Sequence, residues 1–228
     1  MLLDIIRSYQ SGADLTMTIV SVLFSIIIIL FSLSLHETAH GYIAYKLGDP
    51  TAKNMGRLTL NPIKHLDPIG FLCMLIAGFG WANPVPINTR NFKNPRRDMA
   101  LSAAAGPISN LLLAFVNVLF IRLIFIFWHG ENIYFELLFI FCYYAAYMNI
   151  TLAVFNLLPV PPLDGSRLFY VFLPPKWYFG IMKYERIINI VVMVLLITGV
   201  LSPIISFVTR GIFKGMMYIV GLGNATFL

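Results

Sequence analysis

Five consecutive residues, His36-Glu37-Thr38-Ala39-His40, have the types and spacing that metal-dependent hydrolysis requires. On a helix, positions i and i+4 share one face, so both histidines can direct an imidazole toward one metal ion. Glu37 lies beside that face and can reach a metal-bound water, where it would act as general base. The pattern therefore predicts a metal site with hydrolytic chemistry.

Two other interpretations of these residues stay open. The histidines could be an interfacial pair hydrogen-bonded within a helical bundle, with Glu37 paired to a basic loop residue, although ionisable groups at membrane depth are rarely there for packing. They could also line an ion path. A catalytic zinc needs three protein ligands and an open position for water, so the hydrolytic interpretation requires a third ligand elsewhere in the chain.

The composition describes the elements that must position this motif. Of the 228 residues, 59% are hydrophobic and only 11% are charged, whereas soluble domains are about 45–50% apolar and about 25% charged. This composition excludes an ordinary soluble globule. The net charge of +6 lies in short loops between apolar runs, so it indicates membrane topology and no nucleic-acid partner.

Four uncharged stretches are long enough to cross about 30 Å of hydrocarbon, which takes roughly 20 helical residues. They are 15–35, 99–121, 137–163 and 187–209. A fifth, 68–89, holds glycines and prolines that would leave backbone groups unsatisfied in lipid, so we expect it to be re-entrant or buried in protein. The last stretch, 215–228, is a candidate interfacial tail. We expect an all-α polytopic membrane protein with about four to six transmembrane helices and a re-entrant, partly β loop region after the first catalytic helix.

The basic residues orient these spans. Cytoplasmic loops keep the excess of Lys and Arg, and the loops after the first and third spans hold most of them; only Arg210 and Lys214, beyond the fourth span, oppose this orientation. We therefore expect a multi-pass protein of the cell membrane, the inner membrane in a bacterium, with its motif toward the cytoplasm. A single membrane-embedded domain is expected over 1–228, with a catalytic core at about 15–167 and a C-terminal helical region at about 187–228.

Topology favours Asp164 as the third ligand. The motif lies at the cytoplasmic end of the first span, whereas four acidic residues fall on the external side: Asp4, Asp14, Glu131 and Glu136. Among the others, Asp164 alone ends a long uncharged run, and the prolines at 159–162 can turn its carboxylate back toward the first span. The alternative is that Asp164 only caps the loop at Gly165.

The motif and the distal aspartate together resemble the site-2 protease family of intramembrane zinc metalloproteases. The resemblance covers about 32–167: His-Glu-x-x-His in the first span, a Pro-rich Leu163-Asp164-Gly165 segment, and segments at 60–70, 81–86 and 106–110 similar to bacterial members. It implies that His36, His40 and Asp164 bind one Zn²⁺ per chain and that Glu37 is the catalytic base. No loop offers the ~80 residues of an inserted PDZ-like domain, which many relatives have.

Three asparagines within the spans could assist the site. Asn110, Asn149 and Asn156 could join helices or donate to the oxyanion of a tetrahedral intermediate. The resemblance places the segment from Gly106 to Asn110 in the catalytic core, so Asn110 ranks first as an auxiliary catalytic residue and Asn149 second.

Two loop features have a functional and a structural interpretation each. His65 and Asp67 could supply a second metal site or, more simply, fix a tight loop by hydrogen bonds to its backbone. The segments 55–60 and 81–88 have the short alternating pattern of an edge strand, which could hold an unwound substrate by β-addition or be a structural hairpin.

The sequence therefore favours a zinc metalloendopeptidase that hydrolyses peptide bonds within transmembrane segments or near their cytoplasmic edge. The resemblance suggests regulated intramembrane proteolysis or clearance of remnant signal peptides, with a transmembrane protein or peptide as substrate and the lipid bilayer as surroundings. The alternative is a metal-binding transporter or channel that uses the same His36, His40 and Asp164 cluster. Glu37 separates the two hypotheses, because only hydrolysis needs a general base.

Overall fold

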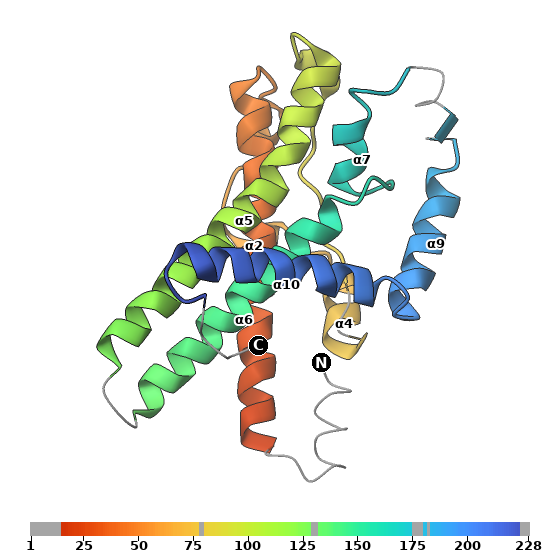
Figure 1. Ribbon diagram of the computed structural model, residues 1–228. Coiled ribbons are helices and arrows are strands. Elements are labelled where there is room, and N and C mark those ends of the chain that lie inside the picture. The colour runs from red at the N-terminus through yellow and green to blue at the C-terminus, as the bar shows by residue number, and fades with distance from the viewer. Residues whose placement is uncertain (1–14, 78–79, 129–131, 175–179, 182, 224–228) are drawn as a thin grey trace.

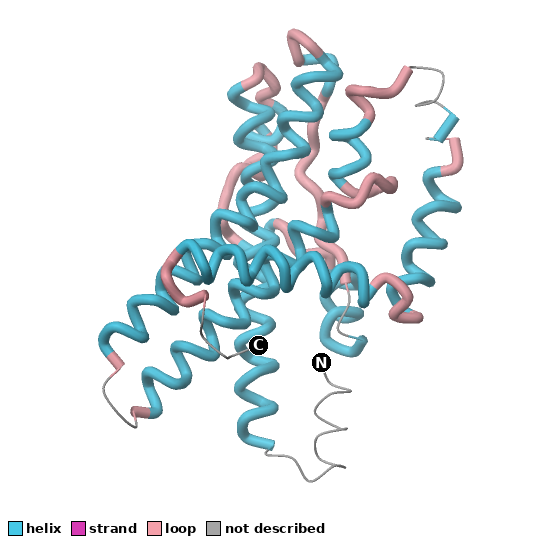
Figure 2. Tube along the Cα trace, viewed as in Figure 1, coloured by secondary structure: helices cyan, strands magenta, loops and turns pink. Residues whose placement is uncertain are grey.

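The computed structural model describes residues 15–77, 80–128, 132–174, 180–181 and 183–223. Within these ranges the chain is helical and forms no regular strand (Figure 2). Three helices are long and apolar enough to cross a membrane: α2 (Leu15–Lys46), α5 (Pro95–Phe127) and α6 (Ile133–Asn156). Each coincides with one of the first three predicted spans, so the expected all-α membrane architecture is confirmed at this level.

The remaining elements are shorter. They are α3 (Thr51–Asn54), η1 (Pro62–Lys64), α4 (Pro68–Ala77), η2 (Thr89–Asn91), α7 (Asp164–Phe169), α9 (Glu185–Ile197) and α10 (Ser202–Ile219). The three long helices form the centre of the molecule, α7 lies along the upper part of α5, and α10 crosses over the bundle (Figure 1).

Small and branched apolar residues hold α5 against α6. Ala114 of α5 and Ala146 of α6 are both fully buried, and small side chains of this kind let two membrane helices approach closely. Ile121 and Ile150 extend the same buried cluster, and Phe213 of α10 closes it from outside. This packing gives α5 a fixed position, and α5 in turn carries several residues that surround the predicted metal site.

The fourth predicted span is wrong as a single helix. The chain forms α9 and α10 with a turn between them, where Gly199 has a φ of +74° that other residues rarely adopt. The 13 residues of α9 rise only about 20 Å, less than the hydrocarbon thickness. Arg210 and Lys214 lie within α10, so the external position that a fourth crossing required of them no longer follows.

The region predicted to be re-entrant and partly β is the ten-residue helix α4 followed by extended chain. In the described residues its β character is limited to one isolated antiparallel bridge, between Leu66 and Ala82. Segment 55–60 forms no ladder with 81–88; instead the Arg57 guanidinium donates to the carbonyl oxygens of Asn83 and Pro84 at 2.7 and 3.2 Å. In place of the predicted hairpin, the extended segment 81–88 is held by hydrogen bonds from the Arg57 side chain.

A buried carboxylate anchors the far end of this extended segment. Asp49 is fully buried after α2 and accepts hydrogen bonds from the backbone N–H of Thr51 and Asn88 and from Asn91 Nδ2, at 3.1, 2.7 and 2.7 Å. Although burial acts to raise the pKa of Asp49, these hydrogen bonds and that of the Thr51 hydroxyl hold the pKa below its ordinary value. The extended segment is thereby tied to the end of α2.

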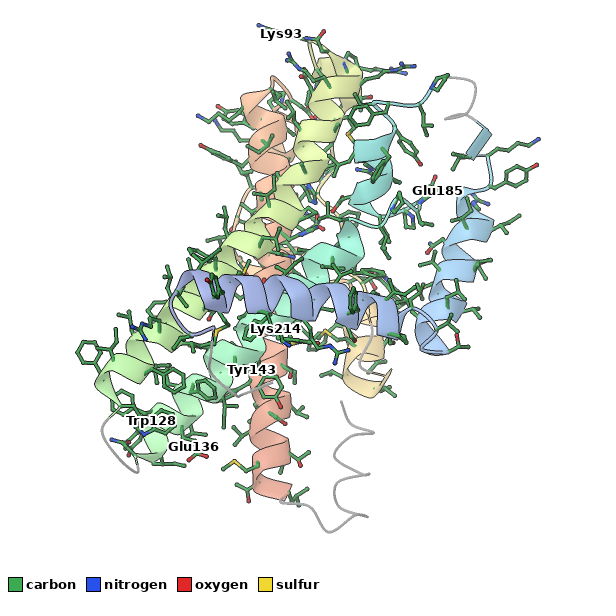
Figure 3. All side chains as sticks on the ribbon, in the orientation of Figure 1. Lys93, Trp128, Glu136, Tyr143, Glu185 and Lys214 are labelled. Atoms are coloured by element: carbon green, nitrogen blue, oxygen red, sulfur yellow. The ribbon has the colours of Figure 1, made fainter. Side chains whose placement is uncertain are left out.

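The two ends of the bundle differ chemically. Lys93 lies at one end, beside the start of α5, whereas Trp128 and Glu136 lie at the opposite end (Figure 3). The position of Lys93 agrees with the distribution of Lys and Arg used above to predict orientation.

Candidate metal centre

Three predicted ligands meet between α2, α5 and α7. His36 Nε2 and His40 Nε2 are 3.0 Å apart, and Asp164 Oδ2 lies 3.1 Å from the first and 3.2 Å from the second. His36 and His40 are 4% and 6% exposed, and Asp164 is half-buried. Three ligand atoms, from two histidines four positions apart and an aspartate 128 positions after the first of them, thus form a nearly equilateral triangle.

The triangle has the dimensions that zinc requires. In a tetrahedral site with bonds of about 2.0–2.1 Å, two ligand atoms lie about 3.3 Å apart, close to the 3.0–3.2 Å observed here. Two imidazoles and one carboxylate are also a donor set typical of catalytic zinc, which keeps a fourth position open. The residues present therefore fit the ion.

A backbone carbonyl in α5 defines the protonation of His40. His40 Nδ1 lies 2.7 Å from the carbonyl oxygen of Ser102, which can only accept, so Nδ1 carries the proton and Nε2 presents a lone pair to the centre. The Ser102 hydroxyl donates to the carbonyl oxygen of His40 at 3.0 Å. Ser102 therefore holds His40 through two hydrogen bonds.

Asn110 contacts the other imidazole. Its Nδ2 lies 3.3 Å from His36 Nδ1, and its Oδ1 is buried with no hydrogen-bond partner among the described residues. If the amide is turned by 180°, that oxygen accepts from Nδ1–H and leaves His36 Nε2 free to bind a metal. A His36 tautomer with its proton on Nδ1, which leaves Nε2 free for a metal, would therefore donate a hydrogen bond to this buried oxygen.

Gly106 makes room for both imidazoles. A Cβ atom at this position of α5 would lie 2.3 Å from His40 Nε2 and 2.5 Å from His36 Cε1, far inside van der Waals contact. Only a residue without a side chain allows α5 to approach the two histidines this closely.

Glu37 is held by the extended segment. Its Oε2 accepts a hydrogen bond from the backbone N–H of Val85 at 2.8 Å. Because Glu37 follows His36 on α2, its carboxylate leaves the helix beside the face that carries the histidines. The other carboxylate oxygen, Oε1, has no hydrogen bond to a described residue and is available for proton transfer.

The structure does not bring the other candidate residues to this centre. Asn149 and Asn156 donate to carbonyl oxygens one turn earlier in α6, those of Ala145 and Leu152. His65 bonds to the carbonyl oxygen of Thr59 at 2.7 Å, and Asp67 accepts from the N–H of Gly70. Within the described chain the one group of acidic, His and Cys side chains close enough to hold a metal is His36, His40 and Asp164.

Ser102 and Val85 act on the site but were missed by sequence reasoning. The carbonyl of Ser102 and the N–H of Val85 are backbone groups, which almost any residue type could supply, so residue type carried little signal; only the Ser102 hydroxyl belongs to a side chain. The one available hint at Ser102 was its place in the small-residue run 102–106, which permits close approach of another helix.

The fold and the donor set together are typical of a membrane-embedded metallohydrolase. Comparison with known proteins makes the class specific, since the model of Peptidase family M50 matches residues 123–202, the part of the chain that contains Asp164. A Bacillus subtilis protein, "Putative zinc metalloprotease YwhC", is 44% identical over 182 residues, covering 77% of this chain and 80% of its own. The chain therefore belongs to peptidase family M50, the site-2 protease family of zinc metalloproteases.

More distant relatives carry similar names. "Putative zinc metalloprotease Rip2" of Mycolicibacterium smegmatis is 33% identical over 178 residues, which are 76% of this chain and 66% of that protein. "Putative zinc metalloprotease MJ0611" of Methanocaldococcus jannaschii is 30% identical over 168 residues, 70% of this chain and 83% of its own. No solved structure matches the chain significantly. Family membership favours the peptidase over the transporter hypothesis.

Proposed function

We propose that this metallopeptidase cleaves peptide bonds within transmembrane segments or near their cytoplasmic edge, with His36, His40 and Asp164 as zinc ligands and Glu37 as general base. The observation that carries the proposal is the triangle of three ligand atoms 3.0–3.2 Å apart beside Glu37. No other group of the described residues offers such a donor set.

The depth of the centre supports cleavage in or near the bilayer. His36 follows Leu15, the first residue of α2, by 21 positions, which correspond to about 32 Å of helix and so to about one hydrocarbon thickness. The basic residues at the same end of the bundle, such as Lys93, support a cytoplasmic orientation in the cell membrane.

Different residues of the chain have different roles in the proposed hydrolysis. Zinc, when bound, would lower the pKa of a coordinated water to about 7 and polarise the scissile carbonyl. Glu37 accepts the proton of the attacking water at Oε1 and then passes it to the leaving amine, while Val85 N–H holds Oε2 in place. Ser102 and Asn110 keep the two imidazoles oriented, which makes Asn110 a positioning residue and not an oxyanion donor.

Helical substrates must unwind before attack, because their carbonyl oxygens are held in i to i−4 hydrogen bonds. Segment 81–88 is extended and is fixed in place by Arg57, by Glu37 and by the Asn83 N–H to His65 carbonyl bond of 2.8 Å, and an unwound substrate would bind along it through the backbone groups that these bonds leave free. Gly, Pro or polar residues near the cut should therefore favour cleavage.

A single substitution tests the proposal. Glu37→Gln should abolish cleavage of a model transmembrane substrate in liposomes while the protein keeps about one zinc per chain, because Gln preserves the shape of the side chain but cannot take a proton. Glu136→Gln, at the opposite end of the bundle (Figure 3), is the matched control and should cleave normally. Cleavage by Glu37→Gln, or zinc transport without any cleavage by the wild type, would contradict the proposal.

A further inference from the structure

Besides the metal centre, a cavity lies deeper along the same helices. It has a volume of about 400 Å³ and is lined by residues of α2, α4 and α6 and by Leu66, Gly80 and Trp81. Ile29 and Leu33 line it from α2, Met74 from α4, and Met148 from α6. The mechanism proposed above makes no use of this cavity.

The cavity continues the active site along α2. At 100° per residue, Ile29 and Leu33 share the helix face of His36 and His40, and Leu33 precedes His36 by less than one turn, about 4.5 Å. The α6 wall reaches Phe155, at the end of the helix from which the chain passes to Asp164. Trp81 begins the extended stretch that leads to Val85 and its hydrogen bond with Glu37. Residues of α2, of α6 and of the segment that starts at Trp81 therefore lead from the cavity to groups of the proposed catalytic centre.

The size and lining of the cavity select its occupant. A helix about 10 Å across would fill 400 Å³ within roughly one turn, so the cavity can receive a few side chains but not a transmembrane helix. The lining side chains are apolar apart from the hydroxyls of Thr151 and Tyr147 and the indole N–H of Trp81, and the Thr151 hydroxyl donates to the carbonyl oxygen of Tyr147. Met74 and Met148 are flexible and adapt to differently shaped apolar partners.

We infer that this cavity is a specificity site, which binds a large apolar side chain of the transmembrane substrate on the membrane-interior side of the scissile bond. The inference rests on the proposed function. The direction follows from α2, because residues 29–33 lie inside its apolar stretch whereas His36 and His40 lie toward its polar end. Leu, Ile, Met and Phe should be accepted, and charged or very small residues disfavoured.

The test compares substrates that differ at one residue. A transmembrane peptide in liposomes is given Ala, Leu or Phe at each of four positions on both sides of the cut, and kcat/KM is measured. In the wild type we expect one interior position where Leu exceeds Ala by roughly tenfold or more, and no such preference on the cytoplasmic side. Met74→Trp, which fills the cavity, should remove the preference for Leu, so that the ratio of kcat/KM for the Leu substrate to that for the Ala substrate falls to about one.

Two further variants keep this test decisive. Met74→Ala enlarges the cavity and should shift the preference from Leu to Phe. Leu72→Trp changes the same helix at a side chain that is 56% exposed and faces away from the cavity, so it should leave all ratios unchanged. Two results would overturn the inference: equal kcat/KM for Ala and Leu at every interior position, or an equal loss for all substrates in Met74→Trp. A cavity filled by lipid, or one with a purely structural role, would produce these results. Failure of the wild type to cleave any substrate refutes the proposed function itself.

Discussion

Replacing Gly106 by alanine should remove zinc from the protein without unfolding it. A Cβ atom at this position would lie 2.3 Å from His40 Nε2 and 2.6 Å from His40 Cε1, and also 2.5 Å from His36 Cε1. Ordinary van der Waals contact begins near 3.4 Å, so at least one imidazole must move by about 1 Å. One added methyl group therefore acts on two predicted ligands at once.

The magnitude follows from the tolerance of the metal. Zinc–nitrogen distances are held within about 0.2 Å of their usual value, and a shift of about 1 Å is several times larger. Disturbing a group that only orients a ligand costs about 10–100-fold in metal affinity, so displacing the ligand itself should cost at least 100-fold, or about 2.7 kcal/mol. Helix propensity acts in the opposite direction, since Ala in place of Gly stabilises a helix by about 1 kcal/mol.

The predicted loss of zinc affinity and the predicted gain in helix stability can be measured separately, so the assay distinguishes them. Zinc per chain is measured by elemental analysis of protein purified in detergent, helix content by circular dichroism, and cleavage on a transmembrane substrate. Gly211→Ala is the matched control, because Gly211 lies in α10 and a Cβ there would meet nothing within 4 Å. We expect Gly106→Ala to keep its helix content but to lose zinc and cleavage, and Gly211→Ala to keep all three.

The reasoning is refuted if Gly106→Ala retains one zinc and wild-type cleavage. In that case α5 can withdraw from α2 at little cost, and the approach of the two helices does not define the centre. Loss of helix content together with zinc would instead mean that Gly106 serves the packing of the bundle.

Three other substitutions follow from the same contacts. Asp164→Ala should lose zinc and cleavage together, and full zinc content by elemental analysis would show that another residue is the third ligand. Asn110→Ala should weaken zinc affinity about 10–100-fold in a chelator titration while Asn149→Ala does not, because only Asn110 contacts His36. Asp49 has a lowered pKa, so its stabilisation is present above the unfolded pKa of about 3.9 and is lost as pH falls through the folded value; thermal unfolding of Asp49→Asn between pH 3 and 7 should therefore depend less on acid than that of the wild type, and an unchanged profile would contradict this.

The metal motif could be predicted because its information is local. His36 and His40 need only a helix to share a face, with Glu37 beside it, and the 21 uncharged residues before His36 make that helix hard to avoid in a membrane. The contacts that orient the predicted ligands and Glu37 are different, since a backbone carbonyl like that of Ser102 is present in every residue type and an N–H like that of Val85 in every type but proline. Their partners depend on how α5 and segment 81–88 pack on α2, which hydropathy does not encode.

The error in the fourth span has a related cause. Hydropathy measures the transfer of side chains into lipid and does not report whether the backbone remains one helix. In 187–209 the uncharged run is continuous, yet the turn at Gly199 divides it, and Pro203 then begins α10 with a nitrogen that needs no hydrogen bond. A span prediction that also weighed this Gly and Pro would have placed the break.

The prediction of Asp164 needed its residue type and its side of the membrane, both of which can be inferred from the sequence. Its position in the structure also depends on packing contacts of the neighbouring residues, which its residue type does not indicate. Topology selects it as an acid on the correct side, but a carboxylate in the loop that follows the third predicted span could point in any direction. The structure turns it inward because Gly165 packs against the carbonyl of Leu157, where a Cβ atom would lie at 2.3 Å, and Ser166 donates through its hydroxyl to Leu163. The chain therefore folds back on the end of α6, and α7 starts beside α5 with Asp164 facing His36 and His40. The position of Asp164, the proposed third ligand, thus depends on the residue that follows it, Gly165.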